Sequence, residues 1–236
     1  PRTLLLGLVL LAALVVPARA HNGAAAFAVP LRDIRIDGDL SDWPVDMARY
    51  PIALPEFGVY PRDSEDFQAH FRIGYDADAQ ALYLAIEVED ESVVIADDEP
   101  PNWNNVDGCD LFIDLKHATD SEVLQYSLWG DTRLVFGSEQ ALGNKREFEV
   151  AALRTANRHQ YEWRLDLGEI SSGQYQMQPG AIMGFDIVVN EKDADGSFSW
   201  MTWGQGISKT NFAARRGAAT SFLPARATRS GTSTAS

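Results

Sequence analysis

Short apolar segments limit the fold most, because they follow one another along the body of the chain at near-regular spacing. Residues 71–75 and 161–165 alternate apolar with polar or small side chains, and turn-forming sequences such as Asp76-Ala77-Asp78 separate the segments. This alternation is typical of half-buried β-strands, and no long stretch after the first twenty residues has helical period. The predicted strands are residues 71–75, 82–89, 111–115, 124–128, 133–136, 148–153, 161–165 and 182–189. We therefore predict an all-β fold, a single jelly-roll-like antiparallel β-sandwich.

The first twenty residues have the three parts of a secretory signal peptide. Arg2 gives a positive flank, residues 4–16 are apolar or glycine, and Ala18 and Ala20 form a small-residue cleavage pattern. The apolar run is shorter than the roughly 20 residues that cross a bilayer. We expect a signal peptide at residues 1–20 and a secreted or periplasmic protein with no membrane span after cleavage.

The mature chain is expected to form one domain. Residues 21–30 are predicted to be a flexible leader, residues 31–224 the sandwich, and residues 225–236 a disordered tail rich in Ser, Thr, Gly and Arg. Residues 48–66 are rich in proline and polar side chains, which predicts a long surface loop.

Charge and cysteine content exclude several classes of protein. The chain carries 34 acidic and 20 basic residues, a formal net charge of −14. So acidic a chain is a poor binder of phosphate backbones, and we expect no nucleic-acid partner. Its one cysteine, Cys109, allows no internal disulfide.

A polar strand face and a loop tryptophan are the candidate ligand contacts. Asp110 lies on one side of a predicted strand, and Gln125 and Ser127 share one side of the next. Such a side is either solvated or the floor of a ligand site. Trp103 lies in a proline-stiffened polar loop, where it either covers the sandwich end or offers a platform for the apolar face of a sugar ring.

Carboxylates also suggest a calcium site. Asp193-Ala194-Asp195-Gly196 resembles a fragment of a calcium loop, although the Glu that completes an EF-hand does not follow. A plain turn is the alternative reading. Asn190, just before it, and Asp90, at the end of a predicted strand, are further candidate ligands, so the predicted metal set is Asp90, Asn190, Asp193 and Asp195.

Five sequence blocks, in order, resemble the family 9 carbohydrate-binding modules and their DOMON-like relatives. The blocks are IDGDLSDW (36–43), YDADAQALYLAIEVED (75–90), NWNNVDGCDLFID (102–114), YEWRL (161–165) and GFDIVVNEKD (184–193). The resemblance extends from about residue 31 to about residue 223. It implies a β-sandwich that holds structural calcium and binds sugar between two tryptophans.

The resemblance also assigns residues. Trp103 falls at the first clamp position, and Trp203 is the nearest aromatic residue to the second, although the family's spacing is longer. Asp110 matches an acid of the family's polar floor, whereas Gln125 and Ser127 stand where the family has Arg and Asn. We expect stacking on Trp103 and Trp203, and hydroxyl contacts from Asp110, Gln125 and Ser127.

Enzyme motifs are missing from the sequence, which has no Gly-x-Ser-x-Gly, no His-Glu-x-x-His and no phosphate loop. The sequence therefore predicts a secreted, non-catalytic module that binds a poly- or oligosaccharide, with another exported enzyme or receptor as a second candidate partner. Three alternatives stay open. They are a sensor or adhesion module, a DOMON-like haem carrier with His70 and Met183 or Met201 as axial ligands, and a copper brace at His21 completed by His70, His117 or His159.

Overall fold

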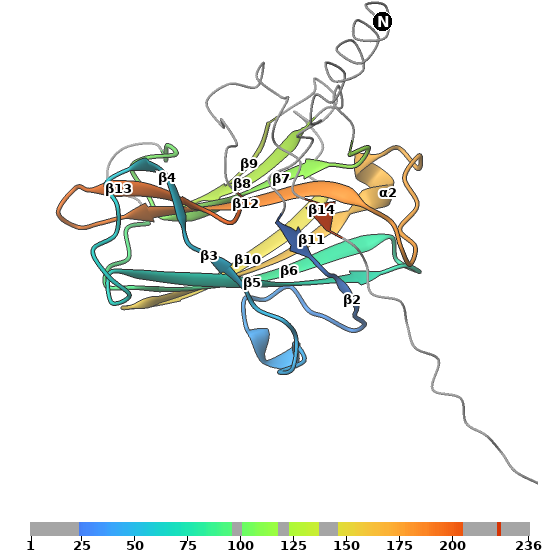
Figure 1. Ribbon diagram of the computed structural model, residues 1–236, viewed down its shortest axis with the longest axis horizontal. Coiled ribbons are helices and arrows are strands. Elements are labelled where there is room, and N and C mark those ends of the chain that lie inside the picture. The colour runs from blue at the N-terminus through green and yellow to red at the C-terminus, as the bar shows by residue number, and fades with distance from the viewer. Residues whose placement is uncertain (1–23, 96–100, 118–122, 137–145, 205–220, 223–236) are drawn as a thin grey trace, which may run out of the picture.

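Two β-sheets lie one above the other in the computed structural model, which describes residues 24–95, 101–117, 123–136, 146–204 and 221–222 (Figure 1). The all-β sandwich prediction is confirmed, and each of the eight predicted strands lies within or overlaps an observed one. The predicted signal peptide at 1–20 and tail at 225–236 lie outside the described residues. Within the described part of the chain, no helix has the length and apolar character needed to cross a membrane.

The larger sheet has eight strands, and β7 and β12 are its centre. In spatial order they are β1 (Ala25–Ala26), β14 (Ser221–Phe222), β12 (Met183–Lys192), β7 (Gly108–Asp114), β8 (Leu124–Trp129) and β9 (Thr132–Phe136), with β13 (Phe198–Thr202) paired to β12 and β4 (Leu54–Gly58) to β13. β14 and β13 pair with different stretches of β12, residues 183–184 and 188–192.

The smaller sheet has six strands and two short neighbouring helical turns. In spatial order the strands are β10 (Phe148–Thr155), β11 (Arg158–Asp166), β6 (Ala81–Asp90), β5 (Phe67–Asp76) and β2 (Val29–Pro30), and β3 (Tyr50–Ile52) also pairs with β5. A 3-10 turn, η2 (Leu40–Asp42), and a short helix, α2 (Leu167–Ile170), are the helical elements of the described residues. Pairing is antiparallel except for β1 with β14 and β2 with β5.

Two expectations about loops are corrected. Residues 24–30, expected in a flexible leader, contribute β1 and β2, and Ala26 and Ala28 are fully buried. Residues 48–66, expected to be one long loop, contain β3 and β4. Both strands carry a proline, Pro51 or Pro55, and β4 forms an edge of the larger sheet, where a missing N–H costs no ladder hydrogen bond.

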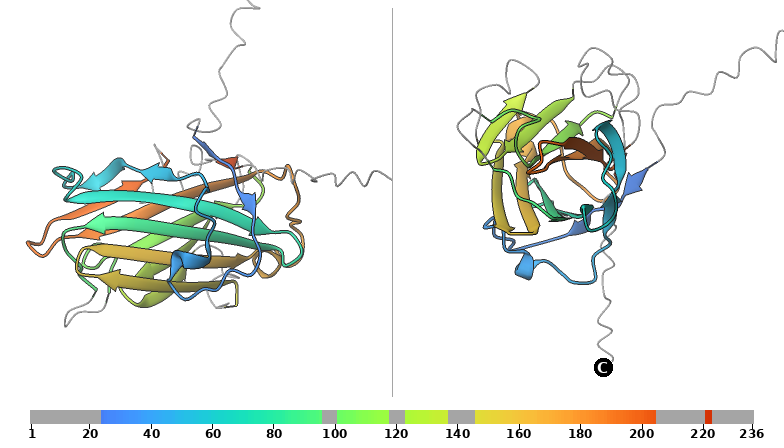
Figure 2. Two further views of the ribbon diagram at one scale, coloured as in Figure 1. Left: turned by 90° about the horizontal axis from the view of Figure 1, so that it is seen from below. Right: turned by 90° about the vertical axis from the view of Figure 1, so that its left-hand side faces the viewer.

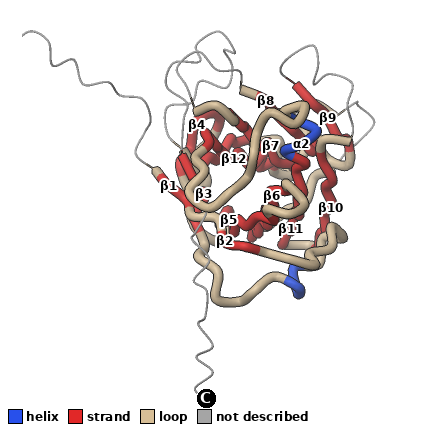
Figure 3. Tube along the Cα trace, turned by 90° about the vertical axis from the view of Figure 1, so that its right-hand side faces the viewer, coloured by secondary structure: helices blue, strands red, loops and turns tan. Residues whose placement is uncertain are grey.

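The two sheets face each other in the end view of Figure 3, and period-two alternation places the core between them. From β7, Cys109, Leu111 and Ile113 point inward and join core residues of the smaller sheet such as Leu84 and Trp163. The intervening residues of β7 must then point to the outer face of the larger sheet. This alternation carries Asp110 out of the core.

A segment before β3 covers part of the outer face of the smaller sheet (Figure 2). Trp43 lies at the centre of this cover, packed with Leu31 and Tyr83. Its Nε1 donates to Oε1 of Glu162 at 2.8 Å, and the other oxygen of Glu162 accepts from the backbone N–H groups of residues 37 and 38. One buried carboxylate therefore ties the cover to β11.

Replacing Trp43 with alanine is expected to lower the free energy of unfolding by about 3–5 kcal/mol, because it opens a cavity and leaves Glu162 short of a donor. Val45→Ala is the matched control, since Val45 belongs to the same segment and is 92% exposed. It should change stability by less than about 0.5 kcal/mol. Urea unfolding measures both, and equal effects would contradict the role given to Trp43.

Candidate functional site

A buried polar network occupies the outer face of the larger sheet. Oδ1 of Asp110 accepts hydrogen bonds from Nε2 of Gln125 at 3.0 Å, from Nε1 of Trp129 at 3.0 Å and from Oγ of Ser127. Its Oδ2 accepts from Nδ2 of Asn190 at 3.2 Å. Strands β7, β8 and β12 each contribute to this network. The structure thus brings together Asp110, Gln125 and Ser127, as their shared face predicted.

Asp110 itself is fully buried. Burial raises the pKa of its carboxyl group, and the hydrogen bonds from Ser127, Gln125, Trp129 and Asn190 oppose that shift. Because four donors already surround the carboxylate, it is suited to hold their side chains in place rather than to meet a ligand directly.

An aromatic cluster lies beside this network. The Trp103 ring centroid is 4.9 Å from Trp200, 5.4 Å from Phe198 and 5.5 Å from Phe57. Phe57 is 47% exposed and Trp103 is half-buried, whereas Phe198 and Trp200 are buried beneath them. The outer part of the cluster therefore presents aromatic surface.

Trp203 is not part of this cluster. It lies in the core between the sheets, with its ring centroid 5.1 Å from Phe71 and 6.2 Å from Phe185. The structure does not bring Trp103 and Trp203 together. Alternation along 198–203 explains why, because Trp200 points outward and Met201 and Trp203 do not. Read with period two, the sequence favours Trp200 as the partner of Trp103.

Two polar atoms of this face have no partner among the described residues. Nε1 of Trp200 and Oδ1 of Asn190 are buried and make no hydrogen bond. The two residues are register partners on the neighbouring strands β13 and β12. A buried donor and a buried acceptor on adjacent strands suit a hydroxyl group, which both accepts and donates.

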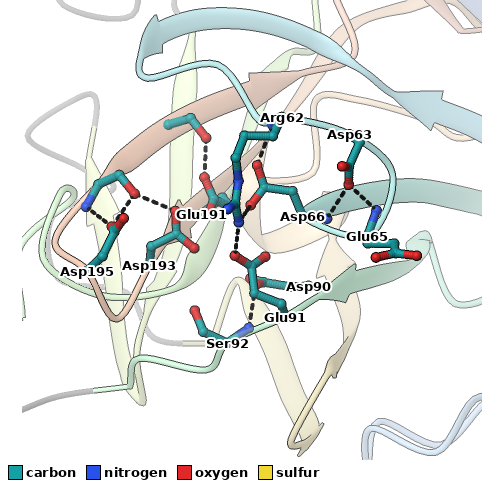
Figure 4. Close-up of polar contacts among 12 residues, drawn as sticks. Arg62, Asp63, Glu65, Asp66, Asp90, Glu91, Ser92, Glu191, Asp193 and Asp195 are labelled. Carbon is teal, nitrogen blue, oxygen red and sulfur yellow. Dashed lines mark hydrogen bonds and ion pairs between the residues drawn. The ribbon is translucent and has the colours of Figure 1, made fainter.

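An acidic cluster lies at one end of the sandwich, where β6 and β12 finish (Figure 4). Carboxylate oxygens of Asp90, Glu191 and Asp193 lie within 4.8 Å of one another. Oε2 of Glu191 accepts from Oγ of Ser199, whereas its buried Oε1 accepts no hydrogen bond from a described residue. Burial, more than the neighbouring acids, raises the pKa of Asp90 and of Glu191 to about 8.

An arginine already neutralises the adjoining acids. The Arg62 guanidinium is 2.9 Å from Asp66 and 2.7 Å from Glu91, and its hydrogen bond holds the pKa of Asp66 down at about 2. Asp66 and Glu91 form a second group of close oxygens with Asp193. Since Arg62 supplies a cation there, Asp90, Glu191 and Asp193 remain the group in need of one.

Two of the four predicted metal residues lie elsewhere. Asn190 is on the outer face, bonded to Asp110. Asp195 accepts from the backbone N and Oγ of Ser197, at 2.8 and 2.6 Å, which makes it part of the turn. The sequence prediction did not include Glu191. Because successive side chains of β12 point to opposite faces, Glu191 points away from the face that carries Asn190.

A third close group combines Asp90 with Asp107 and His159, all buried. Nε2 of His159 is 3.6 Å from Asp90 and 3.8 Å from Asp107, and burial lowers the pKa of the imidazole to about 4. Asp107 accepts from the backbone N–H groups of Val94 and Lys192, at 2.5 and 2.7 Å. Asp107 therefore joins two chain segments below the acidic cluster.

The histidine alternatives gain no support. His70 bonds Glu87 at 3.1 Å on the outer face of the smaller sheet, whereas Met183 and Met201 lie in the core, so the proposed haem ligands are not brought together. His21 lies outside the described residues.

Comparisons with known proteins agree with this architecture. A structure titled as a family 9 carbohydrate-binding module from Caldicellulosiruptor kristjanssonii with cellotriose matches with a TM-score of 0.61 and 17% identity, covering 87% of this chain and 95% of that one. A structure of a family 9 module from the same organism with glucose gives a TM-score of 0.62 at 16% identity, covering 88% of this chain and 99% of that one. A comparison with curated protein sequences gave no significant match.

The family comparison is decisive. The model described as "Carbohydrate family 9 binding domain-like" matches residues 36–213, which is most of the chain and includes both the aromatic cluster and the acidic cluster. The modules of this family are non-catalytic, which agrees with the prediction from the sequence that this chain is not an enzyme. The chain belongs to the carbohydrate family 9 binding domain-like family.

Proposed function

We propose that this protein is a carbohydrate-binding module that holds an oligosaccharide on the outer face of the larger sheet. The observation that carries the proposal is the pairing of exposed aromatic surface, at Phe57 and Trp103, with the unpartnered polar atoms of Trp200 and Asn190. Family membership and the cellotriose and glucose bound by the structural relative support it.

The chemistry of a sugar fits these groups. The C–H face of the ring packs on Trp103 and Phe57, while hydroxyl groups meet the polar side chains beside them. In this proposal Phe57, and not Trp203, is the second aromatic contact. Asp110 and Ser127 position Gln125 and Asn190, whose remaining amide atoms then contact the hydroxyl groups, while Trp129 gives its single N–H to Asp110.

Trp103→Ala is expected to weaken binding of cellotriose at least about tenfold, because it removes the larger stacking surface. Phe57→Ala should have a smaller effect in the same direction. Phe27→Ala is the control, since Phe27 is a 51% exposed aromatic residue outside this cluster. Calorimetric titration, preceded by a glycan array, measures the effects. Binding that is equal in wild type and Trp103→Ala would refute the site, and a wild type that binds no glycan would refute the function.

We also propose that a calcium ion binds Asp90, Glu191 and Asp193. Calcium takes 6–8 oxygen ligands, and Oε1 of Glu191, which accepts no hydrogen bond from a described residue, supplies one of them. Asp90 and Glu191 are buried and costly to ionise together, so a divalent cation stabilises their charged forms. Backbone oxygens and water are expected to complete the coordination.

Calcium is expected to raise the midpoint of thermal unfolding, and excess chelator to lower it. Free calcium at 100 times its dissociation constant is expected to stabilise the folded chain by about 2.7 kcal/mol. Glu191→Gln and Asp193→Asn should abolish the difference between the two conditions. Asp195→Asn should keep it, because Asp195 bonds Ser197 instead. An unchanged wild-type midpoint would refute calcium binding.

Without calcium, the free energy of unfolding is expected to fall as pH rises from about 5 to about 7. In the folded chain the pKa values of Asp90, Glu191 and Asp107 are about 8, 8 and 7, whereas in the unfolded chain such groups ionise near about 4. Over that range the folded state holds more protons, so higher pH favours unfolding. Chemical denaturation in chelator measures this slope.

The variant Asp90→Asn/Glu191→Gln should reduce that slope, because neither replacement titrates. Added calcium should also reduce it in the wild type. A double variant with the full wild-type slope would show that other groups carry the pH dependence.

A further inference from the structure

On the outer face of the smaller sheet, the carboxylate of Glu87 lies within 4 Å of three arginine side chains. Glu87 of β6 is 3.1 Å from Arg72 on β5 and 2.5 Å from Arg158 on β11, and its Oε1 also lies 3.9 Å from Arg49. His70 adds a hydrogen bond at 3.1 Å, which with the arginines lowers the pKa of Glu87 to about 2. Three guanidinium groups thus share one carboxylate.

Arg49 is the surplus cation of this group. Arg72 and Arg158 hold Glu87 at hydrogen-bond distance, whereas 3.9 Å is too long for Arg49 to donate. The Arg49 side chain is 56% exposed and makes no hydrogen bond to a described residue. Its five N–H donors therefore remain available to an external acceptor.

Arg49 and His70 both line a pocket of about 630 Å³, a volume in the usual range of small-ligand sites. The pocket lies along β3 and β5, which pair with each other, and along the residues that follow β4. Tyr60, which is 65% exposed, and Pro51 give it an apolar wall, and the exposed Gln68 adds an amide. None of these side chains belongs to the aromatic cluster around Trp103.

We propose that this pocket is a second carbohydrate subsite, which binds an acidic sugar unit of the hexuronate class. The Arg49 guanidinium pairs with the sugar carboxylate, the Tyr60 ring packs on its C–H face, and Gln68 bonds its hydroxyl groups. This subsite goes beyond the neutral-sugar site and does not depend on it.

One acid of the pocket and the net charge of the chain favour a singly charged unit over a denser polyanion. Asp63, which also lines the pocket, is engaged by the backbone N–H groups of residues 65 and 66, and it repels multiply charged groups such as phosphates. The net charge of −14 acts in the same direction over a longer range. A carboxylate attached to a sugar ring matches one surplus guanidinium and one aromatic wall.

Titration calorimetry with trigalacturonate and with cellotriose tests the proposal on the full chain. Arg49→Gln should weaken trigalacturonate binding by about tenfold and leave cellotriose binding unchanged. Tyr60→Ala should weaken it similarly. Arg32→Gln, which removes another exposed arginine, should have no effect, and Trp103→Ala should weaken cellotriose binding alone. Thermal melts verify that Arg49→Gln and Tyr60→Ala remain folded.

Further ligands separate the acidic-sugar reading from simple charge attraction. The methyl ester of trigalacturonate should bind about tenfold more weakly than the acid, and triglutamate should not bind measurably. Failure of the wild type to bind trigalacturonate, binding that Arg49→Gln leaves intact, or triglutamate binding of equal strength would overturn the proposal. A wild-type protein that binds trigalacturonate but not cellotriose would refute the Trp103 site and support this one.

Discussion

The arrangement of polar side chains on the outer face of the larger sheet depends on the hydrogen bonds that the buried carboxylate of Asp110 accepts. It stands on β7, the strand between β8 and β12, and it bonds side chains of both neighbours. An unpaired carboxylate at this depth costs far more than a satisfied one, so its four donors must hold their positions. Trp129, Gln125 and Asn190 are fixed in this way, and Asn190 in turn lies beside Trp200. A strand that is polar on one face thereby becomes a rigid base for an aromatic surface.

Alternation along single strands separates the functions of adjacent residues. Asn190 belongs to the outer-face network and Glu191, next in the chain, to the acidic cluster. Trp200 packs on Trp103, while Met201 lies in the core. A shift of β12 by one residue would exchange these roles, so strand register is as important to the site as residue type.

The sequence predicted the fold well because alternation is a local signal, and all eight strands expected from it are present. It also predicted that Asp110, Gln125 and Ser127 would gather, since their strands are neighbours in sequence and in space. Trp203 was assigned from its spacing along the chain, and spacing alone does not indicate to which face of the sheet a side chain points. Phe57 and Arg62 were missed because proline-rich sequence predicted a loop, and only the pairing of β4 with β13 places Phe57 beside Trp200. Long-range pairing of this kind leaves no periodic signal.

Opposite charges gather at different places on an acidic chain, and their surroundings decide what each group can bind. At the end of β12, buried acids exceed the local cations, because Arg62 neutralises only Asp66 and Glu91. On the outer face of the smaller sheet, three arginines surround the carboxylate of Glu87, and only two of them hold it at hydrogen-bond distance. The first imbalance is buried, so it favours a small desolvated cation over a large ligand. The second place is half-exposed and adjoins an aromatic wall, so it suits an organic anion with an apolar face. Net charge alone describes neither place, since it averages over both.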